Sequence, residues 1–282
     1  MPEKIVVASD GGAASRAAMD WVANRALHTP AAVEVVTVEE LDRRPIGADE
    51  SKYRRKYVEV LASAEKYLAG RHGITFLSTT LLAGEPADEI VHAAGHVDWL
   101  VVGSSRRSAD TPDLHGTLAL RIAARTASRL TVVPTDWTPA LGSVIVGIDE
   151  DGSSDEALDV AIAEASRMAR DLVLVHAWSL PAPFSVLEGL LKTSYPTLEA
   201  LHRRRLKKAA TRVKLIAPRL KATSILNFGS PAAVLAEVAR DQALLVLGRH
   251  HRSRLEHLFL GSVGHAVLLA APAPVMIVPG QK

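Results

Sequence analysis

The sequence predicts an α/β protein built from two tandem, doubly wound domains. Three observations carry this prediction: an ordinary globular composition over 282 residues, a repeat that spans the whole chain, and short Val- and Ile-rich runs that alternate with longer segments of helical period. The length suits two domains of roughly 140 residues each. We expect each domain to contain five mainly parallel strands covered on both faces by about four helices.

The repeat is visible where the two copies place the same residues. The first copy opens IVVASDGGAASRAAMDWVA and the second VIVGIDEDGSSDEALDVAIA, which aligns Asp10 with Asp149 at an offset of 139. Later landmarks agree at an offset of 145, as Gly103 and Gly248 do. The larger offset indicates an insertion in the second copy, which we place within residues 178–200.

Each copy contains five candidate strands. Their runs of Val, Ile and Leu are nearly continuous, which is typical of parallel strands buried on both faces. In the first copy the candidates are residues 4–8, 33–38, 74–80, 99–103 and 130–134. In the second copy they are residues 143–148, 172–177, 223–227, 243–248 and 274–278.

Local signals set the helix starts and the domain boundary. Ser153 lies three residues before Glu156, the spacing of a capping box, and predicts a helix start there. Pro139 and Gly142 interrupt regular structure between the copies. We therefore place the first domain at residues 1–136 and the second at residues 142–282.

Composition excludes several classes of protein. The absence of cysteine excludes disulfides, thiolate metal sites and cysteine nucleophiles. A net charge of +2 and an aromatic content of 4% argue against a nucleic-acid binding protein. The apolar stretch Ala266–Val278 contains two prolines and is too short for a membrane span. We predict a cytoplasmic protein that has no membrane among its partners.

Ligands of open parallel α/β sheets bind beyond the carboxyl ends of the strands. The residues at these ends are Asp10, Val38, Asp149 and Ala177, together with the loops that follow Gly103 and Gly248. Asp10 and Asp149 could contact a nucleoside or could simply cap the turn that follows each strand.

The two loops share a pattern suited to phosphate. Each has a Gly at the strand end and then a Gly followed by Thr or Ser, at Gly116-Thr117 and Gly261-Ser262, before an apolar helix. Backbone N–H groups, a hydroxyl and the positive end of a helix dipole would all face a bound anion there. Thr117 and Ser262 would also serve as helix N-caps without any ligand.

At these residues the chain resembles the universal stress protein family in its tandem form. The pattern of the nucleotide-binding members is G-x2-G-x9-G-(S/T), and Gly103, Gly116 and Thr117 match it. So do Gly248, Gly261 and Ser262, followed by Val263 in a stretch, LGSVGHAV, that is similar to the family's C-terminal signature. The middle glycine is absent from both copies, where Arg106 and His251 stand instead.

The resemblance implies two flavodoxin-like domains of the adenine nucleotide alpha hydrolase-like type, with a regulatory role in stress or dormancy and without catalysis. From the residues themselves we predict no metal site. The resemblance implies ATP or another adenine nucleotide as ligand, with or without Mg²⁺, bound by the residues named above. It also implies a homodimer that acts through a further protein partner. If only one copy binds, we expect the second, because it keeps Gly261-Ser262-Val263-Gly264.

Two alternatives stay open. Arg106 and His251 could close the cradles, which would leave a nucleotide-free module for dimerisation or partner binding. A hydrolase or adenylyl-transfer enzyme would need groups aimed at the phosphates and a Mg²⁺ site, and no catalytic motif occurs in the chain. The basic run Arg203–Lys208 is interpreted as the solvated face of an amphipathic helix.

Overall fold

Ten strands form where the sequence has its continuous aliphatic runs. The computed structural model describes residues 1–47, 49–104, 115–149, 154–179, 195–249, 260–270 and 272–280. In the first half the strands are β1 (Glu3–Ala8), β2 (Ala31–Glu39), β3 (Ile74–Ala83), β4 (Trp99–Ser104) and β5 (Arg129–Pro134). In the second half they are β6 (Val144–Gly147), β7 (Leu172–Trp178), β8 (Ala222–Phe228), β9 (Leu244–Gly248) and β10 (Val275–Val278). All ten predicted strands are confirmed, and no end differs by more than three residues.

Helices connect the strands in both halves. In the first half they are α1 (Ala13–Ala26), α2 (Glu50–Leu68), α3 (Pro86–Ala93) and α4 (His115–Arg125), with a short 3-10 helix at Leu41–Arg43. In the second half they are α5 (Asp155–Met168), α7 (Tyr195–Ile216), α8 (Pro231–Val238) and α9 (Ser262–Ala270). The predicted α/β class with about four helices per half is confirmed within the described residues.

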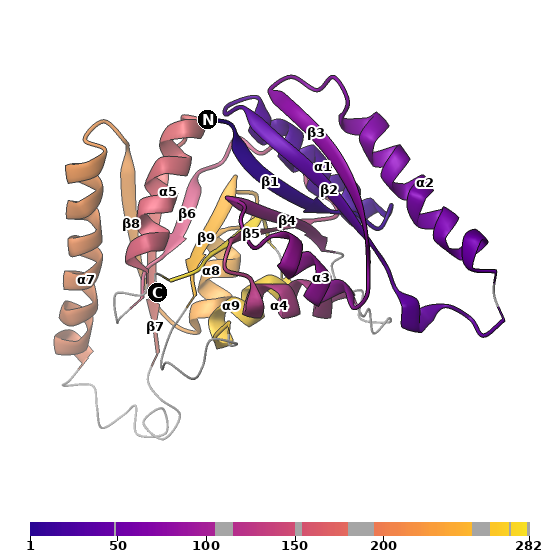
Figure 1. The fold of residues 1–282 in the computed structure, drawn as a ribbon. Coiled ribbons are helices and arrows are strands. Elements are labelled where there is room, and N and C mark those ends of the chain that lie inside the picture. The colour runs from indigo at the N-terminus through magenta and orange to yellow at the C-terminus, as the bar shows by residue number, and fades with distance from the viewer. Residues whose placement is uncertain are drawn as a thin grey trace.

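The two halves share one sheet (Figure 1). Its strand order is β3-β2-β1-β4-β5-β10-β9-β6-β7-β8, so each half has the order 3-2-1-4-5. Neighbouring strands are parallel except β5 and β10, which pair antiparallel with Val132 opposite Val275. The two five-stranded units therefore join edge to edge through their fifth strands, and in Figure 1 α2 and α7 lie at opposite ends of the molecule.

Helices cover both faces of the sheet because alternate side chains of each strand point in opposite directions. Ile5 and Val7 of β1 pack into one core with α1, α2, α5 and α7, whereas Val6 packs into the other with α3, α4, α8 and α9. Each core continues from one half into the other. None of the helices within the described residues is long and apolar enough to cross a bilayer.

A buried ion pair links the halves across α1 and α5. Arg25 donates to both carboxylate oxygens of Glu164, at 2.7 and 3.0 Å, and to those of Glu3, both at 2.8 Å. Its guanidinium also lies 4.0 Å from the ring centre of Trp99. Burial alone would raise the pKa of Glu164, but Arg25 and Arg167 outweigh it and hold that pKa below its ordinary value.

A second link joins the end of β9 to α4. The buried Arg249 donates from one guanidinium nitrogen to the carbonyl oxygens of Ala123, at 3.2 Å, and Thr126, at 2.7 Å. Ala123 lies in the last turn of α4 and Thr126 directly follows it, at the helix end where a cation interacts favourably with the helix dipole. Burial lowers the pKa of Arg249.

The capping box predicted before α5 and the predicted insertion both lie partly outside the described residues. The α5 helix begins at Asp155 with Ser154 as its N-cap and without a side-chain cap hydrogen bond, while Ser153 of the expected capping box lies outside the described residues. Most of the segment expected to contain the insertion, residues 180–194, lies outside them too.

Candidate functional site

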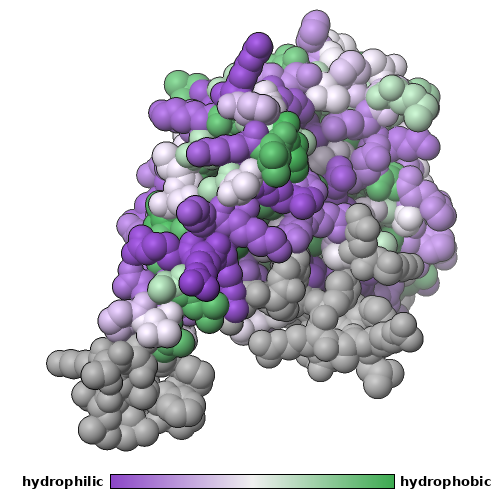
Figure 2. Space-filling model, turned by 90° about the vertical axis from the view of Figure 1, so that its left-hand side faces the viewer, coloured by the Kyte–Doolittle hydropathy of each residue, from purple (hydrophilic) through white to green (hydrophobic). Residues whose placement is uncertain are grey.

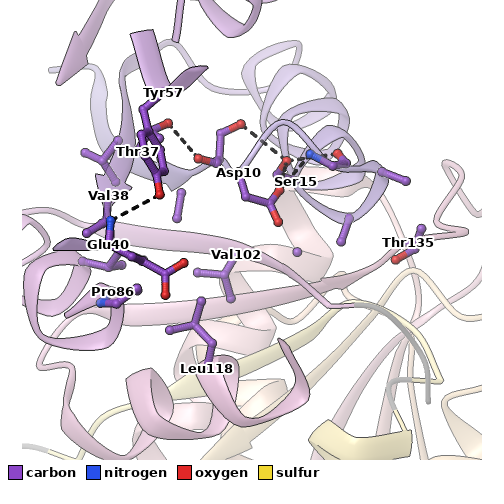
Figure 3. Close-up of a pocket in the computed structure, with 18 residues that line it drawn as sticks. Asp10, Ser15, Thr37, Val38, Glu40, Tyr57, Pro86, Val102, Leu118 and Thr135 are labelled. Atoms are coloured by element: carbon purple, nitrogen blue, oxygen red, sulfur yellow. Dashed lines mark hydrogen bonds between the residues drawn. The ribbon is translucent and has the colours of Figure 1, made fainter. Parts of the chain in front are cut away.

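The first half contains a cavity of about 370 Å³ at the carboxyl ends of its strands. It lies beside the neighbouring strands β1 and β4, where the strand order of this half reverses. Figure 3 shows polar groups of Asp10, Ser15 and Tyr57 on one side of it and the apolar side chains of Val102 and Leu118 on the other. Such switch points are the usual ligand sites of open α/β sheets.

Asp10 organises the turn between β1 and α1. One oxygen of its carboxylate accepts hydrogen bonds from the backbone N–H of Gly12 and from the Ser15 hydroxyl, both at 2.8 Å. Gly11 has a φ of +82°, a left-handed conformation that glycine adopts without strain. Asp10 thus has the turn-capping role that the sequence allowed, and its exposed side chain also lines the cavity.

The end of β2 forms the opposite wall. Thr37 donates its hydroxyl to the carbonyl oxygen of Ser9 at 2.7 Å, which ties β2 to β1, and Val38 lines the cavity from the same strand. Glu40 follows β2, and its backbone and side chain lie at the rim (Figure 3).

Two tyrosines of α2 hold the Glu40 backbone. The Tyr53 hydroxyl donates to the Glu40 carbonyl at 2.9 Å, the Tyr57 hydroxyl donates to Tyr53 at 3.0 Å, and the Glu40 N–H donates to Tyr57 at 3.4 Å. Burial, then the hydrogen bond with Tyr57 and the nearby carboxylates, raise the pKa of Tyr53 to about 12. The Tyr53 phenol is therefore expected to act as a neutral hydrogen-bonding group at neutral pH.

Gly103 at the end of β4 allows the start of α1 to approach. A Cβ at this position would lie 2.1 Å from the carbonyl oxygen of Ala14 and 2.8 Å from the backbone nitrogen of Ser15. No side chain fits there without moving α1. Gly103 also lines the cavity, so the same close contact that packs α1 on β4 shapes the site.

The structure brings Asp10, Val38 and Gly103 together around the cavity, as their strand-end positions predict. Arg106 lies outside the described residues. Gly116 and Thr117 belong to the first turn of α4, which begins at His115. The expectation that Thr117 is the N-cap, the residue just before the helix, is therefore wrong, because Thr117 is already the third residue of α4.

The second half differs from the first at the equivalent strand end. Asp149 follows β6 and donates its backbone N–H to the Ser154 hydroxyl at 3.0 Å, and Ala177 is half-buried in β7. His176, which aligns with Thr37 at the offset of 139, hydrogen bonds through Nδ1 to the Ile148 carbonyl at 2.7 Å. An imidazole thus takes the place of a threonine hydroxyl.

Further rings extend this cluster. The Nε2 atom of His176 lies 2.9 Å from Nδ1 of His202, which aligns with Tyr57 at the offset of 145. Trp178, aligned with Glu39, stacks on His202 with ring centres 4.5 Å apart, and Phe228 contacts Trp178 edge-on. Four rings therefore gather on the α7 side of the sheet in the second half. Three of the aligned positions in the first half, Thr37, Glu39 and Ala83, have no ring, and the fourth is Tyr57.

The remaining predicted residues of the second half that the structure describes lie at the end of β9 and at the start of α9. Gly248 ends β9, and His251 lies outside the described residues. Gly261 has a left-handed φ of +77°, and Ser262 and Val263 begin the helix directly after it. The expected helix start at Gly261-Ser262 is confirmed, but Ser262 is the first residue of the helix, so the expectation that it is the N-cap is wrong by one residue.

Sequence reasoning missed Tyr57, Pro86 and Leu118 as cavity residues. Pro86 was available as a repeat landmark, since Gly84-Glu85-Pro86-Ala87 matches Gly229-Ser230-Pro231-Ala232. Tyr57 carries no motif, and its position depends on how α2 packs. The described residues contain no group of three or more side chains able to hold a metal ion.

Comparisons with known proteins agree with this architecture. The family model described as "Universal stress protein family" matches residues 1–134 and 141–279. A universal stress protein of Mycobacterium tuberculosis is 28% identical to the chain, covering 97% of it and 96% of the relative. One from Mycolicibacterium smegmatis is 28% identical with the same coverage.

A solved structure has the same fold over the whole chain. The crystal structure of a universal stress protein from Archaeoglobus fulgidus matches with a TM-score of 0.69 at 15% identity, covering 99% of this chain and 97% of that one. Because the family model matches both halves, the chain belongs to the universal stress protein family and contains two of its units in tandem.

Proposed function

We propose that this stress-response protein binds an adenine nucleotide in the cavity of its first half. The observation that carries the proposal is the position of a cavity of about 370 Å³ at the topological switch point, bordered by Asp10, Val38 and Gly103. Its volume lies within the usual range of small-molecule sites, about 300–1,000 Å³. The resemblance of Gly103, Gly116 and Thr117 to the nucleotide-binding pattern supports the same ligand.

The polar groups suggest how the ligand would lie. Asp10 and Glu40 place carboxylates at the cavity, and carboxylates accept hydrogen bonds from ribose hydroxyls or a base amino group but repel phosphate. The phosphates would therefore lie toward the start of α4, where backbone N–H groups and the positive dipole end favour an anion. Apolar side chains such as Val102 and Leu118 would contact the base.

The side chains favour the first half over the second as the binding half, although the glycine pattern alone favours the second. In the first half Thr37 lines the cavity, whereas in the second His176 occupies that position and is bonded to His202. Larger rings at corresponding positions leave less room for a base. We therefore propose one nucleotide per chain.

Isothermal titration with ATP, with and without Mg²⁺, tests the proposal. Leu118→Trp would fill the cavity from α4, and we expect it to weaken ATP binding at least tenfold. Val263→Trp places the same side chain at the aligned position of α9 and serves as the matched control. It should bind ATP as the wild type does.

Three outcomes are informative. No heat of ATP binding by the wild type would contradict the proposal and support the nucleotide-free alternative. Loss of binding in Val263→Trp alone would show that the nucleotide binds in the second half instead of the first. Phosphate release by the wild type that is absent in Leu118→Trp would show that the site also hydrolyses ATP. We do not expect this, because no catalytic motif occurs in the sequence.

The proposal also retains a cytoplasmic location, a homodimer and a further protein partner, as the family resemblance implies. Analytical ultracentrifugation of the full chain tests the dimer. A single species at the mass of one chain, 30.1 kDa, would contradict it.

A further inference from the structure

The outward face of α7 carries a concentration of positive charge that the fold does not need. The helix contains seven Lys and Arg against the single acidic residue Glu199, a net charge of +6, whereas the whole chain has only +2. Figure 2 shows the end of the molecule that contains α7, where hydrophilic side chains predominate around isolated hydrophobic ones. The remainder of the chain is therefore net negative.

Four of these cations form what we call the basic face: Arg204, Lys207, Lys208 and Lys214. All four side chains are exposed, and none forms an ion pair with any described residue. Other cations of the helix are neutralised, as in the pair of Arg212 with Asp159 at 2.6 Å. The described residues therefore supply no counter-charge for the basic face.

The repeat provides an internal reference for this helix. The α2 helix is the counterpart of α7, and the buried contacts are kept, since Leu61 aligns with Leu206. The exposed sides of the two helices differ. In α2 and at its C-cap the positions aligned with the basic face are neutral or acidic: Glu59, Ala62, Ser63 and Ala69. Packing on the sheet therefore explains the buried side of α7 but not its charge.

Two exposed leucines lie at the ends of the basic face. Leu201 is 45% exposed and Leu215 79% exposed. At 100° per residue, Leu201, Arg204, Lys208 and Leu215 project from one side of the helix, opposite the buried Leu206. Exposed aliphatic groups among lysines suit the boundary between lipid headgroups and acyl chains.

From this arrangement we infer that the basic face docks the protein on an anionic lipid surface. The contact is peripheral, because the apolar side of α7 is buried in the core and is not available for insertion. Three of the four cations are lysines, which act as point charges and lack the two-pronged geometry of arginine toward single phosphates. Leu201 and Leu215 would have apolar contacts in a bilayer but none on a sugar-phosphate backbone.

Vesicle co-sedimentation of the full chain tests this inference. We expect binding to vesicles that contain phosphatidylserine, weak binding to pure phosphatidylcholine vesicles, and a decrease as salt is raised. Each cation near an anionic bilayer contributes about 1 kcal/mol, or about fivefold in partitioning, so Lys207→Gln with Lys208→Gln and Lys214→Gln should weaken binding about a hundredfold.

The control neutralises three exposed cations of the counterpart helix α2, Lys52→Gln, Arg55→Gln and Lys66→Gln. It changes the net charge equally and should retain most of the binding. Equal loss in both triple variants, or no vesicle binding by the wild type, would overturn the inference. Binding to a duplex DNA or RNA in preference to vesicles, lost in the α7 variant alone, would replace lipid by nucleic acid as the partner. ATP titration of the α7 variant should be unchanged, so this test is independent of the nucleotide site.

Discussion

Gly103 shows how a single residue can serve both the fold and the site. We predict that Gly103→Ala destabilises the protein by about 2–3 kcal/mol, because its Cβ would overlap the Ala14 carbonyl and force α1 away from β4. Urea unfolding of the two proteins measures this difference. Gly95→Ala is the control, since its Cβ would meet only the His92 carbonyl at 3.2 Å. Equal stability of wild type and Gly103→Ala would contradict the close approach described here.

Asp10 makes a second residue-scale prediction, because its turn role and its proposed ligand role can be separated. Asp10→Ala removes the acceptor of two hydrogen bonds and should cost about 1 kcal/mol of unfolding free energy as well as nucleotide affinity. Asp10→Asn keeps an acceptor oxygen, so it should restore most of the stability. If Asp10→Asn also restores full ATP affinity in titration, the carboxylate charge plays no part in binding.

At the scale of elements, α4 depends on a side chain from the other half. We predict that Arg249→Met lowers the free energy of unfolding by about 1–2 kcal/mol, because the Ala123 and Thr126 carbonyls lose their charged donor. Hydrogen exchange in the last turn of α4 should be faster in Arg249→Met than in the wild type, whereas exchange in α8 should change less. A variant with unchanged exchange in α4 would show that the helix end needs no such donor.

Helices and strands were predictable where the sequence pattern that indicates them lies within the element itself. Continuous aliphatic runs located all ten strands, because strands buried on both faces leave no polar alternation. The N-cap prediction at Thr117 was wrong, because α4 begins at His115 and already contains both Gly116 and Thr117. Tyr57 was missed because its place at the cavity depends on the tertiary packing of α2.

The whole molecule could not be predicted in the same way. Pairing of β5 with β10 joins two strands that are far apart in the sequence, and neither strand carries a local signal for its partner. The sequence therefore predicted five strands in each half but not that they form one joined sheet. One signal was available. Positions 25 and 164 are equivalent at the offset of 139, and a contact between equivalent positions, here Arg25 with Glu164, is expected near the axis that relates two copies.

This pair makes the association of the halves sensitive to acid. The pKa of Glu164 is lowered in the folded protein, so its stabilising effect is complete above its ordinary pKa of 4.5 and is lost as pH falls through the folded value. Glu164→Gln should lose about 3 kcal/mol at neutral pH, at the low end for breaking a buried pair because Arg25 keeps Glu3.

Thermal or urea unfolding between pH 3 and pH 7 measures this effect. We expect the stability of the wild type to fall more steeply with acid than that of Glu164→Gln. The exposed Glu65→Gln, on α2, is the control and should follow the wild type. Parallel curves for all three proteins would show that Glu164 does not contribute.

The most direct test of the account is to count the nucleotides that one chain binds. Native mass spectrometry of the full protein with excess ATP should show one added nucleotide per chain in the wild type and in Val263→Trp, and none in Leu118→Trp. Two nucleotides bound per wild-type chain, or one nucleotide still bound to Leu118→Trp, would contradict the assignment of binding to the cavity of the first half.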